Sequence, residues 1–257
     1  MAVARRALPP LLVAVTIVAL WEAGTFHRLL GLETYTLAYP SAIVRALTDD
    51  WLSLLMHTRV TLTEAMAGYA LGSLSGFVLA VPLCELPPVR RALLPLVSGL
   101  ASMPVIALAP LMVLYFGFGV LSKIAVVVLM TLPPMAITAF KGLSSADRHL
   151  QDVLASFATG RPDLLIKLRL PWSLPFVFTA LKLNVTLSLI GAIIAEFFAA
   201  RQGLGFRMSY ALDTFDMPVA WATMLIAAVL GVIWYQVVVG VERMAIPWHV
   251  SIRSGSA

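Results

Sequence analysis

Charged side chains are scarce in this sequence, at 12% of 257 residues, whereas hydrophobic residues make up 60%. A water-soluble domain has about 25% charged residues and about 45–50% apolar ones. The chain therefore lacks the polar side chains that a folded surface of this size needs in water. Its mean hydropathy of +0.93 points the same way. The composition excludes an ordinary soluble domain and predicts an integral membrane protein.

Motifs typical of catalytic, phosphate-binding or metal-binding sites are also absent from the sequence. Cys84 is the only cysteine, which excludes a disulfide within the chain. No phosphate-binding Gly-x-x-x-x-Gly-Lys loop, Gly-x-Ser-x-Gly elbow or His-Glu-x-x-His helix occurs. The four histidines are far apart, without metal-ligand spacing to one another or to the cysteine: His27, His57, His149 and His249. We therefore expect no enzyme activity, no metal site and no cofactor in this chain. Any energy source would lie on another subunit.

Long uncharged runs predict the fold class. A spanning helix needs roughly 20 mostly apolar residues. The sequence offers six candidate spans, which are Ala7–Trp21, Ala65–Cys84, the run between Arg91 and Lys123, the run between Lys123 and Lys141, Leu174–Ala200 and Met217–Val241. We therefore predict an all-α integral membrane protein with about six transmembrane helices.

Individual residues within these runs predict where the spans turn, bend or reach the membrane interface. The third run holds one span followed by a turn at Gly117 and Gly119. Pro133-Pro134 should interrupt the fourth span. Lys182 lies inside the fifth span, where its side chain can extend to the membrane interface. The first run resembles a secretory signal peptide, with Arg5-Arg6 before it. An uncleaved helix is the favoured interpretation, because no small-x-small cleavage site follows.

The distribution of basic residues predicts the orientation. With the N-terminus inside, eleven Lys and Arg residues fall in inner segments: Arg5, Arg6, Arg90, Arg91, Lys141, Arg148, Arg161, Lys167, Arg169, Arg243 and Arg253. Six fall in outer segments: Arg28, Arg45, Arg59, Lys123, Arg201 and Arg207. Cytoplasmic loops collect Lys and Arg, so both termini should be cytoplasmic. This asymmetry also explains the pI near 9.7 without a nucleic-acid partner.

The longest inner loop contains a patterned segment. Asp147 is a plausible N-cap, and apolar residues follow it at helical spacing: Leu150, Val153, Leu154 and Phe157. The pattern predicts a short amphipathic helix outside the membrane. From periodicity alone, it could rest on lipid headgroups or contact another protein.

This loop resembles the EAA motif of type I ABC importer permeases, E-A-A-x-x-x-G-x9-I-x-L-P. The triplet aligns with Asp152-Val153-Leu154, the glycine with Ala158, the isoleucine with Leu168 and the final pair with Leu170-Pro171. The spacing, the acidic start and the Leu-Pro end are kept, whereas the Ala-Ala pair and the glycine are replaced. In that family the motif docks on the ATPase. The resemblance implies an ATPase-coupling set of Asp152, Ser156, Phe157, Ala158, Leu170 and Pro171.

Other segments extend the resemblance to the nitrate/sulfonate/taurine permease group, over roughly residues 35–245. Leu108–Gly119 followed by Ser122-Lys123 is similar to that group's LAPL-x-x-x-WFG-x-G-x-x-SK segment. Ala195-Glu196-Phe197 followed by Gly203-Leu204-Gly205-Phe206 is similar to its AE…GLG stretch, and Tyr39-Pro40-Ser41 with the helix 42–47 to its entry segment. The group also includes permeases for thiamine precursors, riboflavin and aromatic carboxylates.

The resemblance implies the type I ABC permease fold and its partners. These are a second copy of the chain in a homodimer, two cytoplasmic ABC ATPase subunits that bind the ATP, and an extracytoplasmic solute-binding protein, at a bacterial inner membrane. Residues 1–57 would form an N-terminal helix with an extracytoplasmic segment. Residues 58–245 would form the permease core with a coupling loop at 142–172, and residues 246–257 a cytoplasmic tail. The substrate stays open, because specificity rests largely with the binding protein.

A stripe of small residues in the fifth span has two interpretations. Asn184, Ser188, Gly191 and Ala195 recur on one helix face. Such a stripe is typical of close helix packing, and it could also form the wall of a translocation path.

Two other classes of protein compete with an importer permease. A secondary transporter predicts repeated halves and ionisable residues at mid-membrane, and neither is found. A membrane scaffold would not account for the loop spacing.

Overall fold

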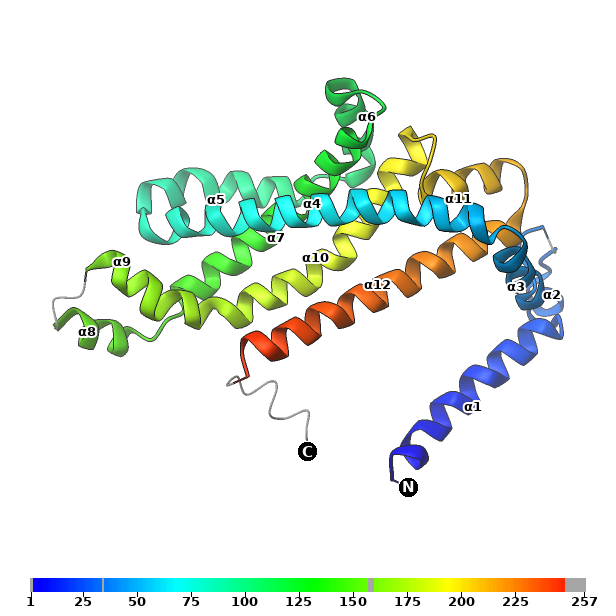
Figure 1. The fold of residues 1–257 in the computed structure, drawn as a ribbon, viewed down its shortest axis with the longest axis horizontal. Coiled ribbons are helices and arrows are strands. Elements are labelled where there is room, and N and C mark those ends of the chain that lie inside the picture. Colours follow the sequence, from blue (N-terminus) through cyan, green and yellow to red (C-terminus); the bar gives the residue numbers. More distant parts are fainter. Residues whose placement is uncertain (1, 34, 157–159, 248–257) are drawn as a thin grey trace.

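The computed structural model describes residues 2–33, 35–156 and 160–247, and every regular element within these ranges is helical (Figure 1). In chain order the elements are α1 (Ala2–Glu22), α2 (Thr25–Leu30), α3 (Pro40–Asp49), α4 (Trp51–Glu85), α5 (Pro87–Ala101), α6 (Val105–Phe116), α7 (Val120–Ser144), α8 (Arg148–Ser156), α9 (Arg161–Leu164), a π-helical turn (Leu165–Arg169), α10 (Leu170–Ala199), α11 (Leu204–Asp213) and α12 (Met217–Ala245). The predicted all-α membrane fold is confirmed.

Four helical stretches are long and apolar enough to cross a membrane: α4, α7, the continuous stretch Arg161–Phe198 that contains α10, and α12. The pair α5 and α6 would add a fifth span, although the two helices are bent by 104° at their junction. Helix α1 covers 21 residues, and its part Leu12–Glu22 is apolar. The six expected runs therefore correspond to these four or five spans and to α1.

Prolines break one of the expected spans and leave another intact. The third run is broken into α5, which ends at Ala101, and α6, which begins after Pro104 in extended backbone. The turn at Gly117 and Gly119 is found as expected, between α6 and α7. The predicted interruption of the fourth span at Pro133-Pro134 is wrong, since α7 is one helix from Val120 to Ser144.

Helices α4 and α7 form the closest contact of the fold. Gly68, Gly72 and Gly76 recur every fourth residue on α4 and face α7. A Cβ atom at Gly72 would collide with the Thr131 side chain, and one at Gly76 with the Leu132 carbonyl oxygen. Small residues at this spacing let two helix backbones approach closely, which is the main means of packing where lipid replaces water. The contact therefore depends on the absence of side chains along this face.

Helix α10 joins the pair through its own small and polar face. The Asn184 amide nitrogen donates to the Ser73 hydroxyl of α4 at 2.9 Å and to the Thr131 carbonyl oxygen of α7 at 2.8 Å. Gly191 lies against Met130 of α7. One amide thus connects all three helices, and an interhelical hydrogen bond of this kind contributes roughly 0.6 kcal/mol, up to about 2. We call α4, α7 and α10 the three-helix wedge.

Helix α12 is held to the wedge by an ion pair. The Lys182 ammonium of α10 donates to both Glu242 carboxylate oxygens of α12, at 2.8 and 3.0 Å. Lys182, whose side chain could extend to the membrane interface, thus has a charge partner on the neighbouring helix.

The α4–α7 contact can be tested with a single methyl group. Gly76→Ala should destabilise the protein, because the added Cβ meets backbone that cannot move aside, and overpacking costs about 1–3 kcal/mol. Gly240→Ala in α12 is the matched control, since no atom lies within 4 Å of its added Cβ. Thermal unfolding of the detergent-solubilised proteins should show a lower midpoint for Gly76→Ala only. Equal midpoints for the two variants would contradict the close packing of α4 on α7.

Candidate functional site

The amphipathic helix predicted from the loop is present as α8, at one end of the bundle (Figure 1). Asp147 caps it as expected, because its carboxylate accepts from the His149 backbone N–H at 2.8 Å. Leu150 and Val153 are 41% and 40% exposed, a large fraction for aliphatic side chains. The helix therefore presents an uncovered apolar face. We refer to this end of the bundle as the α8 end, and to the opposite end as the α11 end.

The predicted coupling residues fall in three places. Asp152 and Ser156 lie on α8 and are exposed. Leu170 and Pro171 begin α10, where proline suits the first helical turn. Phe157 and Ala158 lie outside the described residues.

Arg169 is a residue of this region that sequence reasoning missed. Its guanidinium donates to the Gln151 side chain of α8 at 3.0 Å and forms an ion pair with Glu85 at the end of α4. It also lies 3.5 Å from the Cys84 sulfur. In the sequence, Arg169 is only a basic residue between Leu168 and Leu170. In the folded protein, its side chain connects α8 to the three-helix wedge.

The stripe predicted on the fifth span lies inside the protein. Asn184 and Ser188 have no exposed surface, and Gly191 and Ala195 are buried as well. Asn184 and Gly191 face α4 and α7, and Ala195 packs with Ala109 and Val126. These buried contacts between helices are the ones expected if the stripe serves helix packing.

At the α11 end, Glu196 forms a joint between α10 and α11. Its fully buried carboxylate accepts from the Thr61 hydroxyl at 2.9 Å and from the Gly205 N–H at 2.8 Å. Gly203 has a φ of +108°, and a Cβ there would collide with the carboxylate. A negative charge at a helix N-terminus is favourable. The Ala-Glu…Gly-Leu-Gly pattern is thus explained by a carboxylate that caps α11.

Two further ionisable residues accompany Glu196. Glu64 of α4 and Lys123 of α7 are both 3% exposed, and all three are close enough to interact electrostatically. The Lys123 ammonium donates to the carbonyl oxygens of Phe118, at 2.6 Å, and Gly119, at 3.1 Å. The two glutamates come from different helices, and sequence reasoning did not bring them together.

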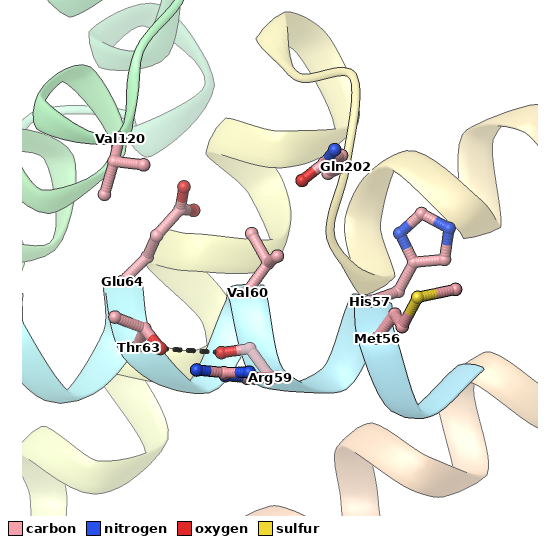
Figure 2. Close-up of a pocket in the computed structure, with 8 residues that line it drawn as sticks. All are labelled: Met56, His57, Arg59, Val60, Thr63, Glu64, Val120 and Gln202. Atoms are coloured by element: carbon pink, nitrogen blue, oxygen red, sulfur yellow. Dashed lines mark hydrogen bonds between the residues drawn. The ribbon is translucent and has the colours of Figure 1, made fainter. Parts of the chain in front are cut away.

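A cavity of about 440 Å³ opens beside these groups. Its walls come from the stretch Met56–Glu64 of α4, from Val120 at the start of α7 and from Gln202 in the loop before α11. Figure 2 shows His57, Val60 and Glu64 projecting from the same side of α4, with the Glu64 carboxylate directed toward Val120. The His57 Nδ1 atom accepts from the Gly203 N–H at 2.9 Å. We call this cavity the α4 groove.

The described structure thus combines an all-helical membrane fold with an exposed amphipathic helix at one end and the α4 groove at the other. The profile of the family "Binding-protein-dependent transport system inner membrane component" matches residues 68–244. The chain belongs to this family. It is a multi-pass membrane permease subunit of an ABC importer, and the ATPase of such systems is a separate subunit.

Relatives and solved structures agree with this assignment. The chain is 32% identical over 245 residues to a formylaminopyrimidine transport permease of Halalkalibacterium halodurans, covering 95% of this chain and 97% of that one. It is 29% identical to the riboflavin transport system permease of Chloroflexus aurantiacus, covering 90% and 86%. It is 27% identical to the taurine transport system permease of Escherichia coli, covering 78% and 73%. The MetNI methionine ABC transporter, solved in an inward-facing conformation, matches with a TM-score of 0.67 at 17% identity, over 77% of this chain and 98% of that one.

Cysteine labelling distinguishes the two interpretations of the stripe. In a Cys84→Ser background, single cysteines at Asn184 and Ser188 should not react with a water-soluble thiol reagent, because both positions are buried between helices. A cysteine at Gln202, which is exposed beside the α4 groove, should react and serves as the control. Reaction at Asn184 or Ser188 in any nucleotide state would instead identify the stripe as part of a wetted path.

Proposed function

We propose that two copies of this chain form the translocation path of an importer for a small organic solute, with two ATPase subunits docked at the α8 ends. The observation that carries the proposal is the uncovered apolar face of α8, which lies at the end of the bundle where α4, α7 and α10 converge. An amphipathic helix without a partner on its apolar face fits a groove on another protein.

Chain direction supports an arrangement in which both termini lie on the same side as the α8 end. Helix α12 starts beside α11 and runs back toward the α8 end (Figure 1). Glu22, at the end of α1, accepts from the Ser41 N–H at the start of α3, which places the end of α1 with α3. In the proposed orientation both termini are cytoplasmic, and a solute-binding protein delivers solute at the α11 end.

The coupling mechanism follows from the contacts at the α8 end. ATP-driven closure of the two ATPases would draw the two α8 helices together. Asp152, Ser156, Phe157 and Ala158 are the proposed contact residues, and Leu170-Pro171 joins the loop to α10. Arg169 would pass the movement on, because its guanidinium holds α8 and the end of α4 at once. The bridge is partly buried, which makes it stronger than a surface ion pair.

The names of the relatives support the substrate class. Permeases named for formylaminopyrimidine, riboflavin and taurine are similar to this chain over most of its length. The proposed substrate is therefore a small organic solute of the nitrate/sulfonate/taurine-like or the pyrimidine/riboflavin/aromatic-carboxylate-like kind.

Docking can be tested by placing a charge on the apolar face of α8. Val153→Asp, and Phe157→Asp in the segment outside the described residues, should abolish co-purification of the ATPase. An unpaired carboxylate in a desolvated contact typically costs a few kcal/mol. Val153 is exposed, so the permease itself should still insert and remain monodisperse. The readout is the amount of ATPase retained with the affinity-tagged permease.

Two controls separate docking from coupling. Ser145→Asp adds the same charge just before α8, at an exposed position, and should retain the ATPase. Arg169→Gln removes the bridge without touching the apolar face, so it should retain the ATPase but lower solute uptake. If Val153→Asp co-purifies with the ATPase as well as wild type does, α8 is not the docking helix.

A further inference from the structure

The turn between α11 and α12 holds a bulky residue in a backbone conformation that suits glycine. Phe215 has a φ of +57°, and within the described part of the chain it is the only residue other than glycine with a positive φ. The Asp216 N–H donates to the Ala211 carbonyl oxygen at 2.8 Å. The Phe215 N–H donates to the Leu212 carbonyl oxygen at 3.2 Å. These two bonds form a Schellman motif, which normally has glycine at this position because a Cβ atom is strained there.

The strained side chain contributes little to the fold. Phe215 is 71% exposed, so burial of its ring does not offset the strain. Helix α2 ends in the same left-handed conformation, and there the chain has Gly31, with a φ of +63°. Neither packing nor backbone geometry therefore explains a phenyl ring at position 215. A strained residue that its own fold does not require indicates a functional role.

The turn lies on the side of the protein opposite the coupling helix. Figure 1 shows it at the end of the bundle farthest from α8. Helix α12, which begins two residues after Phe215, has 29 residues. At about 1.5 Å per residue it is longer than the hydrocarbon core of a bilayer, which is about 30 Å thick. The length of α12 therefore allows Phe215 to stand outside the lipid.

The charges around Phe215 favour a protein partner over a lipid surface. Asp213 is exposed and Asp216 partly exposed, so a carboxylate lies on each side of the ring in the chain. The nearest basic residue in the sequence, Arg207, is paired with Asp50. Segments that anchor in the membrane interface are rich in Lys and Arg. A ring flanked by carboxylates is better suited to an apolar pocket with a basic rim.

We propose that Phe215 is the anchor that docks the solute-binding protein, and that it enters an apolar pocket whose rim carries Lys or Arg opposite Asp213. Aromatic side chains are enriched at the centres of protein interfaces, and a few such residues dominate their binding energy. Opposite charges around the centre steer the partner into register. The inference rests on the proposed importer function, which supplies the partner.

Phe215→Gly separates docking from folding. In the complete complex, reconstituted in lipid nanodiscs, the affinity for the fluorescently labelled solute-binding protein of the same transport system should fall at least about tenfold. The thermal midpoint of the permease should not fall, because the relief of strain offsets the added freedom of the unfolded chain. Phe215→Leu keeps an apolar side chain and should bind more tightly than Phe215→Gly. Asp213→Lys should weaken binding by reversing the charge beside the anchor.

Phe118→Gly is the matched control. Phe118 is 73% exposed, close to the value for Phe215, but it has no positive φ. The same substitution at this position relieves no strain, so it should lower the thermal midpoint. It should leave the affinity for the binding protein unchanged.

A dye at position 215 distinguishes a protein pocket from lipid. Phe215→Cys in a Cys84→Ser background is labelled with a small aromatic fluorophore, which takes the place of the ring. Iodide in the water phase should quench this dye in the nanodisc complex, and addition of the binding protein should protect it. A dye that is already shielded from iodide without the binding protein would identify a lipid anchor and overturn the inference.

Wild-type affinity in a folded Phe215→Gly chain would also overturn it. In either case the proposed importer function stands, provided that the ATPase docks on α8 and the binding protein binds the wild-type complex. A wild-type complex that binds no solute-binding protein would refute the inference and the proposed function together.

Discussion

The close approach of α4 to α7 along Gly68, Gly72 and Gly76 is the constraint on which the rest of the structure depends. With no side chain at these positions, the two backbones come near enough for one Asn184 amide on α10 to reach both partners. Lipid gives no hydrophobic driving force between helices, so packing and these few polar contacts must hold the wedge together. Any Cβ on this face would separate the helices and break the link to α10.

Because the wedge is tightly packed, its two ends are connected mechanically. Arg169 ties α8 to the end of α4 at one end, and Glu196 ties the start of α11 to α4 through Thr61 at the other. The α4 groove lies beside that second joint. Packed cores shift between discrete arrangements and do not deform smoothly, so a displacement of α8 is expected to move the groove as part of one body.

The fold class, the amphipathic α8 with its Asp147 cap and the turn before α7 were all predictable from the sequence. They depend on local composition and helical spacing, which the chain carries in adjacent residues. The unbroken α7 was not predicted, because the effect of a proline depends on what packs around it. The buried charge group of Glu64, Lys123 and Glu196 was missed for a related reason. Its members come from three helices, and no single segment reveals their proximity.

A distance measurement tests the central claim that each protomer of the proposed homodimer moves as one body. Spin labels at Lys141 on α7 and Gln202 before α11, both exposed, would be placed in a Cys84→Ser chain that is diluted with unlabelled copies. The distance between the two labels should stay the same when ATP is trapped. In fully labelled complexes, the distance from Gln202 of one protomer to the partner's Gln202 should change. A change within one protomer as large as the change between protomers would contradict the account.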